Sequence, residues 1–544
     1  MSWYVMPTFE SWEAANESFS WDLPPSYHPA TDLLEKHDDP DRTALIYVEE
    51  PPDGVVEYSF ADLHVASDRL ATVLADRGLS DGDRLGVVVG QRPANPVTHL
   101  AAWKVGAITV PMTVLFGPDA LSYRLQDSGA SVAVVEGNCR GDVETAAGEC
   151  PELDTVVDVG DGCADLAALL DGVDRFDEPL EATPETHTAI MYTSGSTGPP
   201  KGVLHSHALW LGRAAAAFNF FDQGLHDATV WTPADWAWGA ALGGALFGTW
   251  HHGGTVVGWP RQSFDAAAVF EVLEAQDVTH SFLPPTALRM LMRVEEPEVQ
   301  YDLSLETLAS VGEPLTPEIV EWVDGAFADV PINEFYGQTE LNLVIATSAN
   351  WFDLKPGSMG RVLPGYETKV VDPDSLEEVP HGEPGELLVR AGDRRVFFDE
   401  YWEKPDATAA KAVGDGWFRT GDLVEKDEDG YHWFVSRTDD VILTRGYRVG
   451  PMEVESAILD HPAVEQVGVV GVPHHTYGEA IAAFVRPTAS PEDPAALAEE
   501  IKASVREGLA AYEYPDEIHF VDSLPKTSTG KVRRTELREQ ATPG

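Results

Sequence analysis

Lysine and cysteine are both scarce in this chain, and acidic residues far outnumber basic ones. The 544 residues include 36 Lys plus Arg, of which eleven are lysines, against 91 Asp plus Glu, for a formal net charge of −55. Such a surface argues against a nucleic-acid partner, because phosphate backbones bind basic patches. The acid is dispersed along the whole chain, so it does not indicate a disordered acidic tail. We interpret the excess as adaptation to high intracellular salt, where the Debye length near 1 M is about 3 Å; an acidic protein from ordinary salt is the alternative.

The few cysteines exclude a disulfide framework. Cys139, Cys150 and Cys163 also lack the spacing of a metal site, which fits a reducing cytoplasm. Residues 1–21 contain acidic but no basic residues, so they do not form a signal peptide. No apolar run approaches 18 residues, so no integral membrane segment is expected. We therefore predict a cytoplasmic protein; an oligomer is possible.

One stretch combines hydroxyls, glycines and a lysine directly after a short apolar run. The candidate residues are Thr193, Ser194, Gly195, Ser196, Thr197, Gly198 and Lys201. Glycines let the backbone approach an anion closely, hydroxyls donate hydrogen bonds, and lysine supplies a point charge. Because residues 205–221 look helical, we predict a strand, an anion-binding loop and a helix, which is the geometry that holds phosphate. The spacing matches neither a Walker loop nor a dinucleotide fingerprint.

Strands and helices alternate along most of the chain, which predicts an α/β fold. The alternation indicates parallel sheets with flanking helices. Beyond about residue 357, strands with few helices between them predict a barrel-like subdomain, and the last hundred residues predict a compact α+β domain. We expect an N-terminal domain at 1–436 with the barrel-like part at about 357–436, a hinge at 437–440, and a small mobile C-terminal domain at 441–544.

Six further stretches follow the loop, and with it they resemble the acyl-adenylate-forming superfamily. They are 233–239 (PADWAWG), 310–314 (SVGEP), 334–340 (EFYGQTE), 416–423 (GWFRTGDL), 445–451 (RGYRVGP) and 525–531 (PKTSTGK). The superfamily includes acyl-CoA synthetases, peptide-synthetase adenylation domains and luciferases. The motifs occur in the order that the superfamily uses, and the chain resembles medium-chain acyl-CoA synthetases from a halophilic source.

Stretch 334–340 carries the clearest chemistry. The aromatic ring of Tyr336 can stack on adenine, and Thr339 can donate to the α-phosphate. Glu340 offers a hard oxygen ligand of the kind that Mg²⁺ on a nucleotide prefers. We therefore expect Glu340 to be the metal ligand.

The resemblance also implies roles for residues nearer the C-terminus. Asp422 and Arg437 would contact the ribose, Asp439 would be the hinge, and Lys531 would bridge the acyl carboxylate and the nucleotide. Further nucleotide contacts are implied at Gly312, Glu313, Pro314, Glu334, Phe335, Gly337, Gln338 and Arg448, and acyl or CoA contacts at Trp238, Gly239, Val311, Gly337, Gly446 and Tyr447. Many relatives carry Ser or Thr directly before the glycine that corresponds to Gly446. In this chain Arg445 occupies that position, which departs from the usual CoA loop.

The predicted activity is a two-step ligase that uses ATP, CoA and Mg²⁺ and a small-molecule carboxylic acid. The acid and ATP would form acyl-AMP and pyrophosphate, and CoA would then displace AMP. The first step joins two anions, so catalysis must be mainly charge neutralisation and alignment. We expect Lys531, Thr193, Lys201, Thr339 and Glu340 to supply it.

The resemblance leaves the acid and the acceptor open. Acetyl-CoA synthetases carry tryptophan where Gly337 stands, so we expect a larger acid, medium-chain or branched, with an aryl (benzoate-like) acid as the alternative. An adenylating enzyme with another acceptor, such as a luciferase-like oxygenase, shares the same ATP motifs. A peptide-synthetase module is not expected because no carrier domain follows, and a non-catalytic relative is not expected because Lys531 and Glu340 are present.

Overall fold

The computed structural model describes most of the chain. The described residues are 3–52, 54–193, 199–261, 263–312, 315–327, 330–355, 357–445, 447–474, 476, 478–491, 493–509, 514–526 and 531–541, with only the backbone given at 447, 448, 507 and 508. The chain forms two compact units: unit 1 comprises Met1–Thr193, Lys201–Glu367 and Val389–Trp417, and unit 2 comprises Ser194–Pro200, Thr368–Leu388 and Phe418–Gly544. The units divide near residue 417, whereas the hinge expected at 437–440 stays a prediction.

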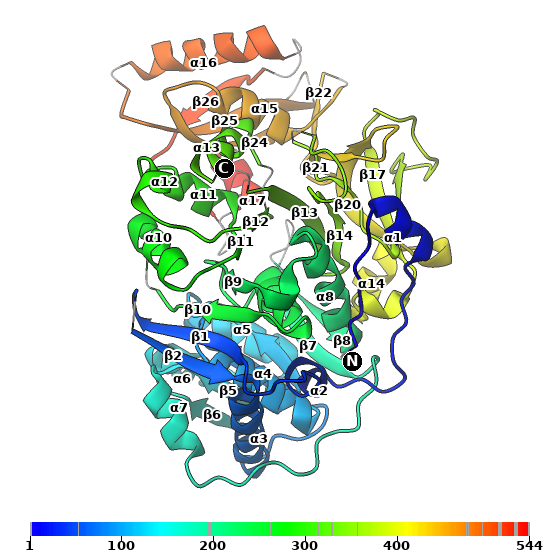
Figure 1. The fold of residues 1–544 in the computed structure, drawn as a ribbon. Coiled ribbons are helices and arrows are strands. Elements are labelled where there is room, and N and C mark those ends of the chain that lie inside the picture. Colours follow the sequence, from blue (N-terminus) through cyan, green and yellow to red (C-terminus); the bar gives the residue numbers. More distant parts are fainter. Residues whose placement is uncertain are drawn as a thin grey trace. The chain divides into compact units, whose positions relative to one another are not determined.

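A nine-stranded sheet forms one layer of the described part of unit 1 (Figure 1). Its order is β15 (Arg361–Val362), β14 (Asn342–Ala346), β13 (Ile332–Gln338), β12 (Thr307–Ser310), β11 (His280–Phe282), β9 (Thr229–Trp231), β10 (Thr255–Gly258), β1 (Thr43–Glu50) and β2 (Gly54–Ser59). The central strands from β13 to β1 run parallel, and antiparallel strands close both edges. Helices α10 (Ala266–Ala275), α11 (Pro285–Leu291), α12 (Pro297–Gln300) and α13 (Pro317–Ala326) follow successive strands. Apolar residues of α10, α11 and α13 share one core with the sheet.

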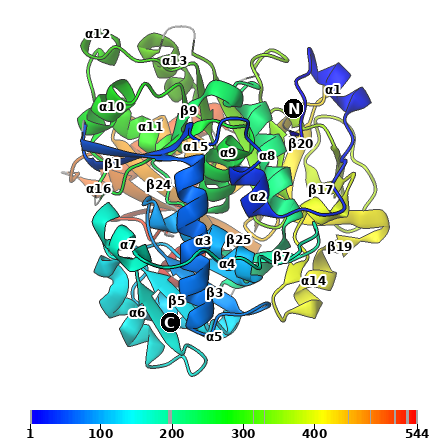
Figure 2. The same ribbon diagram turned by 60° about the horizontal axis from the view of Figure 1, so that its bottom comes forward.

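A seven-stranded sheet forms a second layer of unit 1. Its order is β18 (Glu400–Tyr401), β8 (Lys201–Ser206), β7 (His187–Thr193), β4 (Ile108–Pro111), β3 (Arg84–Val88), β5 (Val132–Val135) and β6 (Thr155–Asp158). Helices α3 (Phe60–Asp76), α4 (Ala94–Val105), α5 (Pro118–Ser128), α6 (Arg140–Ala147) and α7 (Cys163–Leu170) accompany it (Figure 2). Ser59 and Asp62 form a capping box that begins α3, and Gly129 ends α5 in the left-handed conformation.

Two apolar helices run through the interior of unit 1. Every residue of α8 (Ala208–Phe220) is buried, and α8 packs against the π-helix η3 (Ala240–Gly248). An isolated π-turn is a common local feature of functional sites. Shorter elements complete the unit: α1 (Trp12–Ser18), α2 (Pro29–Leu34), α9 (Thr249–His251), α14 (Pro405–Lys411), η1 (Gly137–Cys139), η2 (Leu225–Asp227), η4 (Arg394–Val396) and η5 (Gly414–Gly416).

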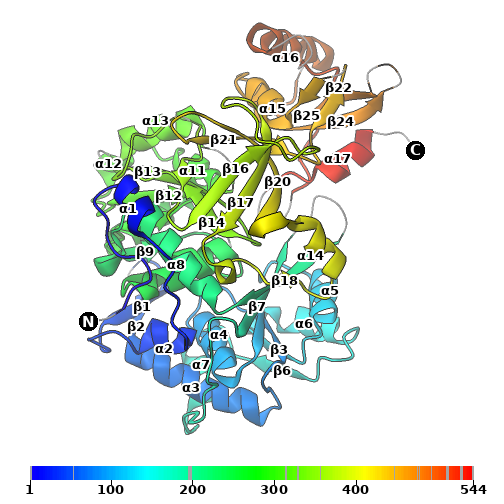
Figure 3. The same ribbon diagram turned by 90° about the vertical axis from the view of Figure 1, so that its right-hand side faces the viewer.

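Two smaller sheets follow in the C-terminal third. One has the order β16 (Tyr366–Val371), β17 (Gly385–Ala391), β20 (Trp417–Lys426) and β19 (Ala412–Val413), with β21 (His432–Arg437) paired to β20 (Figure 3). The other has the order β23 (Tyr447–Val449), β22 (Ile442–Thr444), β25 (Gly478–Pro487) and β24 (Val464–His474), with β26 (Glu517–Phe520) parallel to β25. Helices α15 (Pro451–Leu459), α16 (Pro494–Gly508) and α17 (Arg534–Ala541) pack on this second sheet in two apolar cores.

The fold class expected from the sequence is confirmed: parallel sheets with flanking helices, a barrel-like sheet, and a C-terminal α+β domain. One local expectation is wrong. The segment after the glycine-rich loop begins as strand β8, and helix α8 starts only at Ala208. Among the helices of the described residues, none combines the length and apolar character of a membrane span.

Candidate functional site

The predicted anion loop connects two antiparallel strands. Thr193 ends β7, Lys201 begins β8, and the two residues are direct partners across the hairpin. The Thr193 hydroxyl donates to the Lys201 carbonyl oxygen at 3.4 Å. Ser194, Gly195, Ser196, Thr197 and Gly198 lie outside the described residues. Lys201 is therefore placed by strand pairing, and the described chain continues from it as β8 before α8 begins at Ala208.

Tyr401 links Lys201 to Glu340. Strand β18 pairs with β8, opposite Val203, and this places the Tyr401 ring 5.3 Å from the Lys201 ammonium. The Tyr401 hydroxyl donates to Glu340 Oε1 at 2.6 Å. The loop lysine and the predicted metal ligand thus share one aromatic neighbour. Tyr401 carries no local signal in the sequence, because Glu340 lies 61 residues away along the chain.

Strand β13 divides stretch 334–340 into a buried and an accessible half. Glu334 and Phe335 are buried, and the Phe335 ring stacks on Phe220 with 4.2 Å between centroids. Tyr336, Gly337, Gln338, Thr339 and Glu340 are half-buried. Phe335 is thus a core residue here, whereas Tyr336 and Glu340 are the ones with surface to offer a ligand.

Glu334 is a buried carboxyl group with no cation beside it in the described part of the chain. Its Oε2 accepts a hydrogen bond from the Leu315 backbone N–H at 3.2 Å. Burial raises the pKa of Glu334 to about 8, and the backbone hydrogen bond offsets that shift only in part. Glu334 is therefore mostly protonated at neutral pH.

Gly337 does not border open space. The expectation of a larger acid from glycine in place of the tryptophan of acetyl-CoA synthetases therefore loses its structural reason. A Cβ atom built at 337 would lie 1.9 Å from the Asn342 carbonyl oxygen and 2.8 Å from Leu343 Cα. Pairing between β13 and β14 shifts register at this point. Glycine is needed because the backbone of β14 approaches so closely, and tryptophan at 337 would not fit this conformation.

The predicted acyl stretch places its two tryptophans differently. Trp236 is fully buried beside Gly258, whereas Trp238 and Gly239 are half-buried ahead of η3. Val311 and Gly312 follow β12, and Gly312 has a φ of 107° that suits glycine alone. Glu313 and Pro314 lie outside the described residues.

In unit 2, the predicted ribose residues form an ion-pair network. Asp422 on β20 is the direct partner of Arg437 on β21, and Arg437 Nη1 lies 2.7 Å from Asp422 Oδ1. Arg437 Nε also lies 3.5 Å from an Asp439 oxygen. Lys531 is exposed and directly follows residues 527–530, which lie outside the described residues. These residues are placed within unit 2 alone.

The predicted CoA loop departs from the expected pattern in its first residue. Arg445 has a φ of 54° and forms an ion pair with Asp516, which also accepts from the Ile481 N–H at 2.9 Å. Arg445 therefore ties β22 to the segment before β26. Gly446 lies outside the described residues, and the side chains of Tyr447 and Arg448 are not described.

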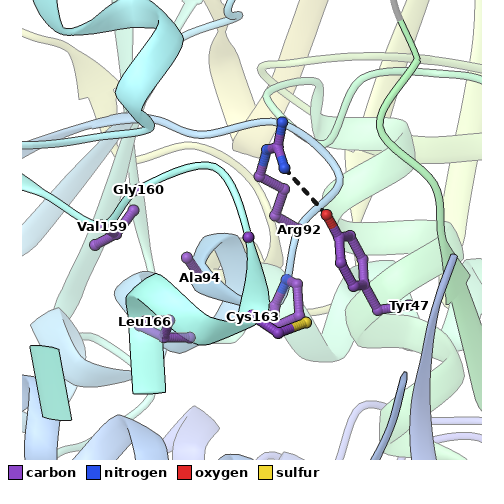
Figure 4. Close-up of a pocket in the computed structure, with 9 residues that line it drawn as sticks. Tyr47, Arg92, Ala94, Val159, Gly160, Cys163 and Leu166 are labelled. Atoms are coloured by element: carbon purple, nitrogen blue, oxygen red, sulfur yellow. Dashed lines mark hydrogen bonds between the residues drawn. The ribbon is translucent and has the colours of Figure 1, made fainter. Parts of the chain in front are cut away.

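Two pockets in unit 1 contain none of the motif residues. One pocket, of about 10 Å³, lies beside Arg92 (Figure 4). The Arg92 guanidinium already has protein partners, since it donates to the Tyr47 hydroxyl at 3.0 Å and forms an ion pair with Glu136 at 3.0 Å. That volume holds about one water molecule. Burial raises the pKa of the adjacent Cys163 thiol, so the thiol stays protonated. The other, of about 380 Å³, is lined by charged and histidine side chains that include Lys104 and Asp68.

The described residues contain no group of three His, Cys, Asp or Glu side chains arranged to hold a metal ion. A single carboxylate is nevertheless enough for Mg²⁺ that is bound mainly by nucleotide phosphates. Glu340 fits that role, since it is half-buried and its Oε1 is already oriented by Tyr401.

Comparison with known proteins identifies the family. Residues 35–402 match the family model of AMP-binding enzymes, and residues 453–531 match that of the AMP-binding enzyme C-terminal domain. The chain belongs to the AMP-binding enzyme family.

Similarity to two acyl-coenzyme A synthetases narrows the class of this AMP-binding enzyme. It is 30% identical to mouse acyl-coenzyme A synthetase ACSM3, mitochondrial, and 33% identical to human acyl-coenzyme A synthetase ACSM4, mitochondrial, in each case over 98% of this chain and 93% of the relative. The expected enzyme class, an AMP-forming acid–CoA ligase, is confirmed.

Solved structures agree with this class. The anthranilate CoA ligase AuaEII in complex with anthranoyl-AMP is 27% identical with a TM-score of 0.85, and covers 96% of this chain and 98% of its own. A benzoate CoA ligase from Burkholderia xenovorans LB400 is 26% identical with a TM-score of 0.82, and covers 94% of this chain and 100% of its own.

Proposed function

We propose that this AMP-binding enzyme activates a medium-chain or branched carboxylic acid to acyl-AMP and transfers the acyl group to CoA. The activation step is supported by the arrangement around Tyr401, which contacts the loop lysine Lys201 and the carboxylate of Glu340. The choice of acid is supported by the similarity to acyl-coenzyme A synthetases. A cation for phosphate oxygens thus lies over the ring of the same tyrosine whose hydroxyl donates to a hard ligand for Mg²⁺.

The chemistry follows from charge. The acid and the α-phosphate are both anionic, so their approach needs positive charge and fixed geometry rather than a protein nucleophile. Lys201 would neutralise phosphate oxygens, Thr193 and Thr339 would donate hydrogen bonds to them, and Glu340 would hold Mg²⁺. When bound, Mg²⁺ would neutralise charge on the phosphates.

Unit 2 would act on the other end of the nucleotide. Asp422, held by Arg437, would accept hydrogen bonds from the ribose hydroxyls, since a carboxylate is a strong acceptor. Lys531 would stand between the acyl carboxylate and the nucleotide during adenylation, and rotation at Asp439 would then give CoA access for the second step.

The test is pyrophosphate release across a panel of carboxylic acids in high KCl, with and without CoA, with acyl-CoA measured separately. Acids of about six to ten carbons should be activated far better than acetate, and acyl-CoA should form only when CoA is added. Preference for acetate over hexanoate and benzoate would overturn the proposed acid. Acyl-AMP without any acyl-CoA would overturn the acceptor.

An aryl acid is the second candidate. Two of the similar structures are an anthranilate and a benzoate CoA ligase, which supports including benzoate and its substituted forms in the panel.

A further inference from the structure

A buried arginine on α8 lacks a partner. Arg213 is 3% exposed and sits in a helix whose other described residues are apolar or small apart from Asn219. Within the described part of the chain, no carboxylate forms an ion pair with it, and its Nε has no hydrogen-bond partner. Burial lowers the pKa of Arg213 to about 10, so the guanidinium remains charged at neutral pH. An uncompensated buried charge is costly and needs a reason.

Two glycines make room for this side chain. A Cβ built at Gly243 would lie 2.8 Å from Arg213 Cγ, and a Cβ built at Gly239 would lie 3.1 Å from Arg213 Nη2. The stem therefore passes under Gly243, and the guanidinium ends beside Gly239. Because Gly239 is half-buried and belongs to the predicted acyl stretch, the charged end is directed to that stretch and not to the protein surface.

The guanidinium also lies on the reactive side of β7. The same Cβ position at Gly239 is 3.3 Å from Met191 Sδ. Side chains alternate along a strand, so Met191 and Thr193 share one face of β7, about 7 Å apart at 3.3 Å per residue. Thr193 is the first residue of the predicted phosphate loop. Arg213 is thus placed about one short acyl chain away from the point where the acid carboxylate would react.

The nearby polar groups do not neutralise Arg213. The Tyr366 hydroxyl and both ring nitrogens of His205 are buried without hydrogen-bond partners in the described residues. Burial lowers the pKa of His205 well below its usual value, so its ring is neutral, and burial raises the pKa of Tyr366, so its hydroxyl keeps its proton. Among the described residues, the site therefore offers donors and a positive charge, and no carboxylate pairs with Arg213.

We propose that Arg213 selects the acid by binding a second oxygen-bearing group, a carboxylate or a carbonyl, at the end of the acyl chain remote from the reacting carboxyl. This inference rests on the proposed function and refines its substrate: a medium-length acid with a polar far end. A guanidinium binds a carboxylate through two parallel hydrogen bonds, whereas a hydrocarbon end would leave the charge desolvated and unpaired.

The test compares acids of matched shape on the full-length enzyme. In each pair one member ends in a carboxylate and the other in the isopropyl group that mimics its shape: glutarate with 5-methylhexanoate, adipate with 6-methylheptanoate, and terephthalate with 4-isopropylbenzoate. A third arm, 5-oxohexanoate, separates a neutral carbonyl from a carboxylate. The measured quantity is kcat/KM for pyrophosphate release.

We expect the oxygen-bearing member of at least one pair to be preferred by about a hundredfold or more, because a site built to hydrogen-bond a group strongly rejects analogues that lack it. Preference for the isopropyl member in every pair would overturn the inference while leaving an acyl-CoA synthetase. No acyl-CoA from any acid would instead overturn the proposed function.

Variants assign the preference to Arg213. In Arg213→Met the ratio within the preferred pair should fall at least tenfold, and Arg213→Lys, which keeps the charge, should retain part of it. The ratio of the two kcat/KM values changes only if the enzyme contacts the far end of the acid. A general loss of folding would lower kcat/KM for both acids of a pair alike. Arg69→Met on α3 is the matched control, because its Nε is also buried without a partner. An unchanged ratio in Arg213→Met would refute the assignment.

Discussion

The candidate-site charges of unit 1 are held differently from the buried charges of unit 2, although unit 1 has buried ion pairs elsewhere, such as Lys104 with Asp68. In unit 1 the ionisable groups of the candidate site stand singly: Glu334 and Arg213 have no oppositely charged partner among the described residues. In unit 2 they occur in pairs, with Asp422 on Arg437 and with Arg534 between Glu455 and Asp440. A lone buried group responds to pH and to ligand charge, whereas a paired group stabilises structure only while both partners remain.

Salt tests whether pairing or net charge dominates, and should have the largest effect. Lowering KCl from about 2 M to about 0.05 M strengthens single ion pairs but also restores repulsion among 91 acidic side chains opposed by 36 basic ones. We expect repulsion to prevail and to remove most of the stability, which is typically about 5–15 kcal/mol for a domain. Thermal melts followed by circular dichroism measure this. Identical melts at the two salt concentrations would show that the acidic surface is not a salt adaptation.

The next largest effect should come from Arg534→Ala. Arg534 Nη2 lies 2.7 Å from Glu455 Oε1, and its Nη1 lies 3.5 Å from Asp440 Oδ2. Removing it leaves the buried carboxylate of Glu455 without its cation, which typically costs about 3–5 kcal/mol, while Asp440 keeps Arg538. Hydrogen exchange should show lost protection in β24, β25 and α15 and none in β3, β4 and β7.

Arg538→Ala is the matched control for that experiment. Arg538 lies on the same helix, is more exposed, and contacts Asp440 at 2.9 Å. Exposed pairs contribute about 0–1 kcal/mol, so protection should change little. Equal losses in the two variants, or loss spread over both units, would contradict the division between paired and lone charges.

Lys531→Ala should separate the two half-reactions. Loss of its ammonium should slow acyl-AMP formation by about a hundredfold or more, equivalent to about 2.7 kcal/mol. Conversion of supplied acyl-AMP and CoA to thioester should continue at close to the normal rate, because in the proposed cycle the domain would by then have turned. Asp439→Pro should do the reverse, since a fixed φ resists the rotation. Lys526→Ala is the control; equal damage to both steps in Lys531→Ala would mean one static site.

Tyr401→Phe removes the hydroxyl that orients Glu340. A hydrogen bond to a charged group contributes about 1.5–3 kcal/mol, so adenylation should slow by roughly tenfold or more, with a higher Mg²⁺ requirement. The readout is the Mg²⁺ dependence of pyrophosphate release in Tyr401→Phe, Glu340→Gln and the double variant. If Tyr401 acts through Glu340, the double variant loses little beyond Glu340→Gln; fully additive losses would exclude that link.

Glu334→Gln should remove a pH dependence of the free energy of unfolding. Of the effects predicted here, we expect this one to be the smallest. The folded-state pKa of about 8 exceeds the ordinary 4.5, so between those values the folded protein holds a proton that the unfolded chain releases. Raising pH through this window therefore lowers the free energy of unfolding, by up to about 1.4 kcal/mol per unit, and the loss ends above pH 8. Denaturant titrations at pH 6 and pH 7 should show this slope in the wild type and not in the variant.

The sequence predicted what depends on neighbours along the chain. Helix α16 of the predicted α+β domain follows from local signals, since Asp493 caps its first turn and Pro494 stands at its first position. The motif residues and the α/β architecture followed from the same kind of pattern. Membership of the AMP-binding enzymes confirmed the expected family.

What failed depends on partners that are far apart in sequence. Residues 201–206 form a strand because β7 on one side and β18, about 200 residues later, on the other complete their hydrogen bonds. The β14 backbone that crowds Gly337 is set by a register shift, which no propensity reveals. Arg213 had one signal, a lone charge in an apolar helix, but its glycine neighbours in η3 could be recognised only in three dimensions.

The packing of Arg213 under Gly239 and Gly243 restricts how this enzyme can acquire a new substrate. A larger side chain at either glycine meets the arginine before it meets the acid, so single substitutions at 239 or 243 carry a steric conflict. A smaller residue at 213 alone leaves a void beside two glycines. The three positions are therefore sterically coupled. A directed-evolution library that varies 213, 239 and 243 together will reach specificities that one-at-a-time mutagenesis does not.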